Sequence, residues 1–198
     1  PDDPSADEIE TIVRGLAEPG TLDVSFGRVH DAAGVLAEFD AERVRREEDE
    51  SASHAPWYLL VLGLQRFRDL RKKDDDFSFS FSSDDDGDDD AGGSPSQHLA
   101  DLLRDGPPLG LHVVAWVDTA TSLSRTLDRQ GIGHFEQRAV LQMSASDSSN
   151  LIDSPEAGKL GMNRGLLYNE ELGALEKFRP YRMPGEDLVR RVAAALAR

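Results

Sequence analysis

The sequence predicts an α/β fold with a mostly parallel sheet, because three apolar runs are separated by helical patterns. Residues 57–64 read WYLLVLGL, residues 109–118 read LGLHVVAWVD, and residues 138–144 read RAVLQMS. Runs without polar alternation are typical of strands covered by helices on both faces. Residues 96–108 (SQHLADLLRDGPP) form a helical pattern between the first two runs, and GPP ends it. Strands that alternate with helices in this way indicate a parallel sheet.

Three more helices are predicted outside these runs. Ser5 and Glu8 have the spacing of a capping box, so a helix is expected to begin near Ser5. Residues 30–51 have an apolar stripe and a charged C-terminal half, the pattern of a long amphipathic helix. Residues 185–198 (GEDLVRRVAAALAR) have the same amphipathic character.

Short strands are also predicted. Residues 165–169 (GLLYN) and 175–183 (LEKFRPYRM) are expected to form a terminal strand pair. Residues 21–27 (TLDVSFG) are a weaker strand candidate. We therefore expect residues 1–198 to form one α/β portion, interrupted by an insertion at residues 74–96.

Composition narrows the possible chemistry. The 198 residues include no cysteine, which excludes disulfides and thiolate-bound metals and agrees with a cytoplasmic location. Five histidines lack metal-ligand spacing, so no metal site is predicted. No apolar run approaches the roughly 20 residues that a membrane helix needs.

The insertion at residues 74–96 is acidic and of low complexity. It holds nine of the aspartates that give the chain its net charge of −16, and no lysine or arginine. We interpret it as a solvated loop. The alternative is an acidic strand that mimics DNA or docks on a basic partner. Outside this segment the chain is only moderately acidic, so a local basic surface for DNA stays possible.

Four stretches occur in a distinctive order. After the strand that ends near LGLQRFRDLR come GPPLGLHVVAWVDT, FEQRAVLQMSASDSSNLID and KLGMNRGLLYN. This order resembles the C-terminal part of the ATPase core of FtsK/SpoIIIE/HerA-type DNA translocases, over about residues 30–181. The residues that carry the resemblance are Gly110, Leu111, His112, Asp147, Ser148, Leu160 and Gly161.

The resemblance implies a RecA-like P-loop NTPase with a three-layer fold, assembled as a homo-oligomeric ring around double-stranded DNA. Such an enzyme needs ATP, Mg²⁺ and a Gly-Lys-Ser/Thr phosphate loop. The sequence has no such loop, since its one Gly-Lys pair, Gly158-Lys159, is followed by Leu160. If the resemblance holds, the loop and its strand are expected before Pro1. ATP and Mg²⁺ are then expected to bind the full-length protein, but not this chain alone tightly.

The resemblance also assigns candidate catalytic residues. The two acids of the Walker B strand would fall on Gly63 and Leu64, which cannot bind a metal or activate water. Gln65 is the nearest polar side chain. Asp118 lies where the family has a polar sensor, so its carboxylate is a candidate replacement. The alternative is that Asp118, with Thr119, caps the following turn.

Other polar residues have two interpretations each. Arg138 is a candidate for contacting a neighbouring subunit's nucleotide, or for a surface ion pair. His112 is interpreted as a core or edge histidine rather than a base. Basic residues after the first two strands are expected to contact DNA phosphates, or else to pair with nearby aspartates such as Asp69 and Asp74. These basic residues are Arg66, Arg68, Arg71, Lys72, Lys73, Arg125 and Arg129.

Two functions therefore remain open. The first is the C-terminal portion of a motor ATPase that couples ATP hydrolysis to DNA translocation. The second is a catalytically degenerate ATPase module that serves ring assembly or partner docking. A chance likeness of an unrelated α/β domain is the third interpretation, and another strand order would favour it.

Overall fold

The computed structural model describes residues 4–17, 20, 22–49, 53–71 and 93–197. Contacts divide the chain into two compact units, each described separately below. The central unit comprises Arg28–Arg138, and the terminal unit comprises Pro1–Gly27 together with Ala139–Arg198. Most of the predicted acidic insertion, together with Lys72 and Lys73, lies outside the described residues.

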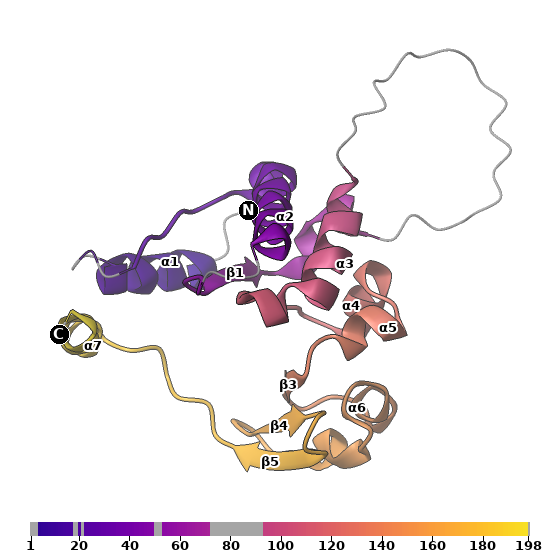
Figure 1. Ribbon diagram of the computed structural model, residues 1–198. Helices are drawn as coiled ribbons and strands as arrows, with labels where there is room; N and C mark the ends of the chain where they lie inside the picture. Colours follow the sequence, from indigo (N-terminus) through magenta and orange to yellow (C-terminus); the bar gives the residue numbers. More distant parts are fainter. Residues whose placement is uncertain (1–3, 18–19, 21, 50–52, 72–92, 198) are drawn as a thin grey trace, which may run out of the picture. The chain divides into compact units, whose positions relative to one another are not determined.

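The central unit is built on a parallel strand pair. β1 (Trp57–Leu62) pairs with β2 (Leu111–Trp116) over their whole lengths, from Trp57 opposite Leu111 to Leu62 opposite Trp116. Between them α3 (Pro95–Asp105) makes the crossover (Figure 1). α3 begins where the Ser94 side chain accepts a hydrogen bond from the backbone N–H of Gln97, so the predicted insertion ends slightly earlier than residue 96.

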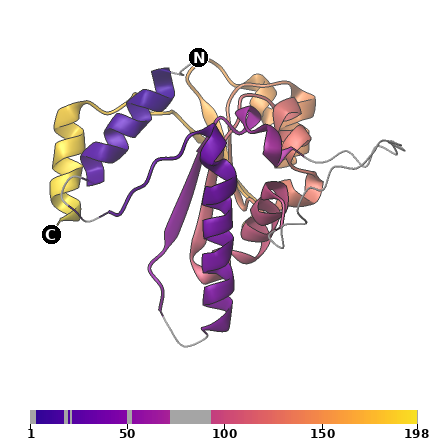
Figure 2. The ribbon, with the colours of Figure 1, turned by 90° about the horizontal axis from the view of Figure 1, so that it is seen from above.

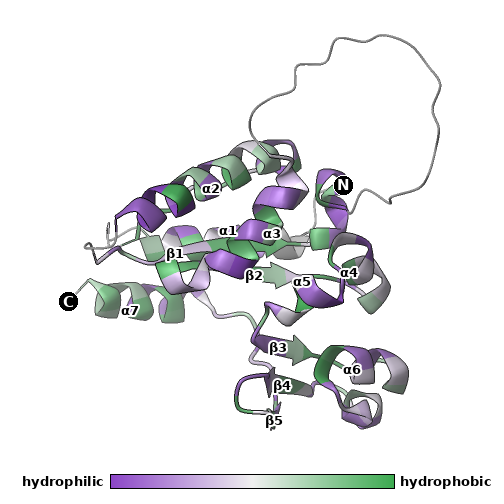
Figure 3. Ribbon diagram, turned by 45° about the vertical axis from the view of Figure 1, so that its right-hand side comes forward, coloured by the Kyte–Doolittle hydropathy of each residue, from purple (hydrophilic) through white to green (hydrophobic). Residues whose placement is uncertain are grey.

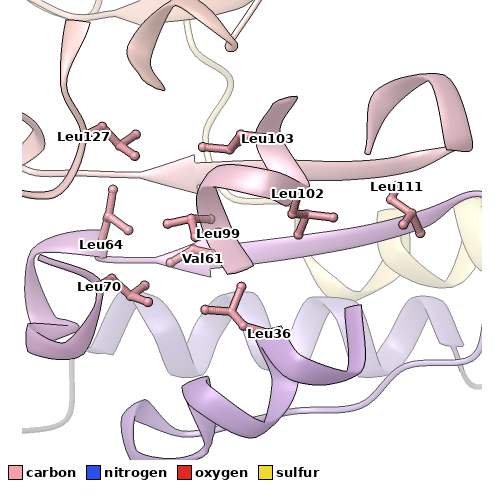
Figure 4. Close-up of a cluster of buried hydrophobic side chains, with 9 residues drawn as sticks. All are labelled: Leu36, Val61, Leu64, Leu70, Leu99, Leu102, Leu103, Leu111 and Leu127. Atoms are coloured by element: carbon pink, nitrogen blue, oxygen red, sulfur yellow. The ribbon is translucent and has the colours of Figure 1, made fainter. Parts of the chain in front are cut away.

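One face of the strand pair is covered by α2 (Ala32–Glu48) and α3. Residues Trp57, Leu59 and Val61 point toward this face, and helix side chains fill the space beside them. Figure 4 shows the buried cluster, which joins strands, helices and the turns after β1. Its members are Leu36, Val61, Leu64, Leu70, Leu99, Leu102, Leu103, Leu111 and Leu127.

The opposite face of the strand pair is apolar and exposed. Tyr58 and Leu60 on β1 are 59% and 52% exposed, and Val114 and Trp116 on β2 are 56% and 50% exposed. Figure 3 shows the hydrophobic character of both strands. The sequence predicts strands covered on both faces, whereas the described residues of the central unit cover only one face.

A buried arginine fixes α2 to the entrances of both strands. Arg46 is 3% exposed, and its guanidinium donates to the carbonyl oxygens of Leu109 (2.8 Å) and Ala55 (2.9 Å). It also donates to Glu42 at 2.6 Å and lies 5.5 Å from the centre of the Trp57 ring. A buried guanidinium whose three nitrogen atoms are all hydrogen-bonded in this way holds the helix at one position along the sheet.

A second, antiparallel sheet has the order β3–β4–β5. Its strands are β3 (Gln137–Val140), β4 (Gly165–Asn169) and β5 (Ala174–Phe178). β4 and β5 form an antiparallel hairpin, as predicted for the terminal strand pair. The third strand of the predicted parallel sheet is therefore placed wrongly by the sequence, because β3 belongs to this sheet and not to that of β1 and β2.

A small core lies beside this sheet in the terminal unit. α6 (Ala145–Ile152) begins at Ser144, whose side chain accepts from the backbone N–H of Asp147, and the 3₁₀ helix η5 (Pro155–Lys159) follows. Ser148 is fully buried and bonds the Ser154 carbonyl and the N–H of Ala157, so it joins α6 to η5. The core residues are Val140, Ile152, Ala157, Leu160 and Leu166.

The terminal unit also holds two helices that pack together, α1 (Pro4–Ala17) and α7 (Glu186–Leu196) (Figure 2). Val189 and Ala193 of α7 are buried.

The described structure is therefore mixed α/β, with seven α-helices, a parallel pair and a three-stranded antiparallel sheet. Residues 22–27 form no strand, so that prediction is wrong. None of the described helices has the length and apolar character needed to cross a bilayer.

Candidate functional site

The carboxyl ends of β1 and β2 lie at one edge of the parallel pair. Beyond the last paired residues, the N–H of Gly63 donates to the carbonyl oxygen of Trp116 at 3.1 Å. The chain after β1 forms the 3₁₀ helices η2 (Leu64–Arg66) and η3 (Arg68–Leu70), and α4 (Ala120–Thr126) packs against η2. Ligands of open α/β sheets bind at such carboxyl edges, so this edge is the candidate site.

Neither position predicted for a Walker B acid is free to present a side chain at this edge. Gly63 has φ +80°, in the left-handed region, and a Cβ there would lie 3.3 Å from Cδ and Nε of Arg66. Leu64 is 1% exposed and belongs to the core cluster. The turn therefore requires glycine and the core requires an apolar residue at the two positions.

Gln65 places a polar group at the same edge. Its Oε1 is buried and accepts no hydrogen bond from the described residues. Buried polar groups in folded proteins are nearly always bonded. This oxygen is therefore available to accept from a water molecule or a ligand.

Asp118 follows β2 and is exposed. It is not the cap of α4, because Thr119 takes that position and accepts from the N–H of Ser122 at 3.0 Å. The Thr119 hydroxyl lies 3.4 Å from Asp118 Oδ1, a long hydrogen bond. The exposed carboxylate of Asp118 is open to solvent or a ligand apart from this one long bond, and it lies just before α4, the helix that packs against the turn of Gln65. The sequence signal that identifies Thr119 as the cap of α4 is a threonine directly before a helical stretch.

Five exposed arginines follow the two strands. Arg66, Arg68 and Arg71 lie in or after η2 and η3, Arg125 lies in α4, and Arg129 begins α5 (Arg129–Gly133). Arg66 takes part in an interaction within the chain.

The other four arginines make no ion pair with any residue in the described ranges. The alternative pairing of Arg68 with Asp69 is therefore not formed, and Asp74 lies outside the described residues. Exposed guanidinium groups that pair with no described residue, on elements that follow the two strands, suit a polyanionic ligand.

The remaining candidates lie elsewhere. Arg138 is half-buried in β3, whose sheet includes neither β1 nor β2, and it interacts within the chain. His112 stacks on Tyr58 with 5.1 Å between the ring centres, on the exposed face of the strand pair. Lys159 of the Gly-Lys pair donates to Glu156 at 2.6 Å, so it is engaged in an ion pair.

Within the described ranges, no group of three histidine, aspartate or glutamate side chains is arranged to hold a metal ion. A search against protein-family models found no match, and a search of curated proteins found none either.

Proposed function

We propose that this chain is the C-terminal portion of an FtsK/HerA-type ATPase core, which couples ATP hydrolysis to movement along double-stranded DNA. The observation that carries the proposal is the carboxyl edge of β1 and β2, where Gln65 and Asp118 follow neighbouring parallel strands. By the resemblance of the ordered sequence stretches, these two strands would be the Walker B and sensor strands of that family. The position of β3 does not support the proposal, because β3 pairs with β4 and not in the sheet of β1 and β2, and this strand order favours a chance likeness.

The exposed face of β1 and β2 supports the three-layer part of the proposal. Parallel sheets are covered on both faces, because their crossovers carry helices. Tyr58, Leu60, Val114 and Trp116 form an apolar surface of the kind that a further helical layer covers. A RecA-like fold supplies such a layer, together with a strand that carries the phosphate loop.

The proposed chemistry assigns limited roles to this chain. The phosphate loop is not among these 198 residues, so the proposal needs it from outside this sequence. Mg²⁺ would neutralise charge on the transferred phosphoryl group of ATP. Asp118 would orient the attacking water through its exposed carboxylate, and Oε1 of Gln65 would accept a hydrogen bond from water at the same edge. Arg138 would act toward the nucleotide of a neighbouring subunit in a ring.

The DNA contact rests on charge. Arg68, Arg71, Arg125 and Arg129 are exposed and unpaired within the described residues, and they lie on elements that follow the two strands. Phosphate contacts require positive charge and no reading of base edges. A motor that moves along any sequence needs contacts of this kind.

A second function is favoured by a separate observation. Because Gly63 is held in a left-handed turn and Leu64 is in the core, the strand end cannot accept its usual acids without rebuilding. This favours a degenerate ATPase module that is kept for ring assembly or partner docking.

Measuring ATP hydrolysis by the full-length protein, with and without duplex DNA, separates the two functions. The motor proposal expects hydrolysis that DNA stimulates. A ring seen by analytical ultracentrifugation without any hydrolysis would favour the degenerate module. Absence of both would contradict both.

A double variant tests the proposed DNA contacts separately from ATP hydrolysis. Arg125→Ala with Arg129→Ala should weaken duplex binding and reduce its salt dependence, because two phosphate contacts are lost. Arg104→Ala is the matched control, since Arg104 is similarly exposed but paired with Asp101 and Asp105. Equal duplex affinity in both variants would contradict the assigned contacts.

A further inference from the structure

A second basic region lies in the terminal unit, between β5 and the first turns of α7. We name residues 177–191 (KFRPYRMPGEDLVRR) the C-terminal basic segment. It holds five basic and two acidic residues in a chain whose net charge is −16. Figure 1 shows its extended part as the yellow stretch that joins β5 to α7.

Most side chains of this segment are open to solvent, Val189 being the buried exception. Tyr181 is 100% exposed, and Arg179, Arg182 and Arg191 are exposed as well. These three arginines make no ion pair with any described residue, whereas Arg190 is paired with Asp187. The segment thus offers three free guanidinium groups around one aromatic ring.

The local backbone presents these groups in an extended form. Residues 179–185 form neither helix nor strand, and proline stands at positions 180 and 184. Proline fixes φ near −65° and removes a donor, so it holds the chain extended and away from sheet pairing. An extended chain between two prolines loses less conformational freedom on binding than a flexible one.

Two shallow grooves adjoin the segment, and Tyr181 and Arg182 line both of them. Asn163 and Arg179 complete the first groove. Leu188 and Arg191 are on the wall of the second. A ligand that followed both grooves would pass Tyr181 with a guanidinium group on either side.

We propose that the C-terminal basic segment binds single-stranded nucleic acid. Arginine binds phosphate oxygens through paired N–H donors. An exposed aromatic ring stacks on any unpaired base, and a cationic groove with such a ring is the usual arrangement in proteins that bind single strands without sequence preference. An acidic protein segment would satisfy the arginines but gives no role to a fully exposed ring. The inference rests on these residues and not on the proposed ATPase activity.

The test is fluorescence anisotropy of a labelled oligothymidylate with this chain at low salt, without nucleotide. Tyr181→Ala should weaken binding at least about fivefold, because stacking contributes that much per base. Arg179→Ala, Arg182→Ala and Arg191→Ala together should weaken it at least about tenfold and flatten its dependence on salt concentration. Thermal unfolding of each variant establishes that it is folded.

Arg190→Ala is the matched control, since Arg190 lies beside Arg191 but is paired, and it should change affinity less than about twofold. The two proposals are tested by different measurements. Oligothymidylate binding by the segment variants tests this proposal, and DNA-stimulated ATP hydrolysis tests the motor proposal.

Three results would overturn the proposal. The first is no oligothymidylate binding by the unmodified chain at low salt. The second is equal affinity for duplex DNA together with an unchanged Tyr181→Ala variant, because a duplex offers no unpaired base to stack. The third is tighter binding of an oligoaspartate peptide than of oligothymidylate, which would assign the segment to an acidic protein partner.

Discussion

The backbone N–H of Gly63 donates to the carbonyl oxygen of Trp116 across 3.1 Å. This bond extends the parallel pairing one residue beyond β1 and fixes the two strand ends together. Everything proposed for the carboxyl edge depends on it, because the turns that carry Gln65 and Asp118 both start there. The first predictions concern the residues that shape this edge.

Gly63→Ala should lower the free energy of unfolding by about 1–3 kcal/mol. The alanine would keep φ +80° only under strain, and its Cβ would press on the Arg66 side chain. Urea unfolding measures the change. Gly161→Ala is the control, since Gly161 is exposed, has no positive φ and has open space at its Cβ, and it should destabilise the protein by no more than about 0.5 kcal/mol. Similar values for both variants would mean that the turn at Gly63 is not formed.

Leu64→Ala should destabilise the protein by about 2–5 kcal/mol, because Leu64 is 1% exposed in the main core. Leu60→Ala removes the same atoms from the exposed face of β1, the strand that precedes this turn. It should cost less than about 1 kcal/mol, since Leu60 is 52% exposed. If both substitutions cost the same in chemical unfolding, Leu64 does not occupy the core and an acid at this position would be tolerable.

Arg46→Ala should cost about 3 kcal/mol or more, because it leaves the carbonyl groups of Ala55 and Leu109 buried without their donor. The adjacent Arg45 binds the same Glu42 but is 54% exposed. Arg45→Ala should therefore cost no more than about 1 kcal/mol. A thermal unfolding comparison in which Arg45→Ala proved the more harmful change would refute this anchoring role.

Glu42 should make stability depend on pH in the acid range. Hydrogen bonds from Arg45 and, against the opposing effect of burial, from Arg46 lower its pKa from 4.5 to about 2. The stabilisation is complete above the unfolded-state pKa and is lost as pH falls from 4.5 toward 2. Unfolding free energies of Glu42→Gln should show a shallower loss over this window. Glu38→Gln, an exposed change on the same helix, should keep the original slope, and an unchanged slope in Glu42→Gln would contradict the assignment.

The sequence allowed the local elements to be predicted, because each has a local cause. Apolar runs predicted β1 and β2, and GPP ends α3 as expected, whereas the helix begins at Pro95 after a Ser94 cap that was not predicted. The end of β1 was placed two residues late, at residue 64. Apolarity cannot distinguish a strand residue from a core leucine in a turn, and Gly63 ends the strand through a positive φ.

Sheet membership could not be predicted from the same pattern. β3 has the same apolar appearance as β1 and β2, yet it pairs with β4. Pairing depends on contacts between residues far apart in the sequence, which periodicity does not record. The candidate site could be predicted only in part for the same reason, because its geometry depends on contacts between distant residues. The family resemblance points to Asp118 and Gln65. The burial of the Gln65 oxygen, which no described residue bonds, and the full exposure of Tyr181 only appear in three dimensions.

The most direct test of the proposed ATPase role is DNA-stimulated ATP hydrolysis by the full-length protein carrying Asp118→Asn. The carboxylate of Asp118 is proposed to replace the acids absent at Gly63 and Leu64. Its loss should therefore lower the rate by about 10²-fold or more. Asp69→Asn, which removes another exposed carboxylate from the same edge, should leave the rate within about twofold. Hydrolysis that is as fast in Asp118→Asn as in Asp69→Asn would contradict the account.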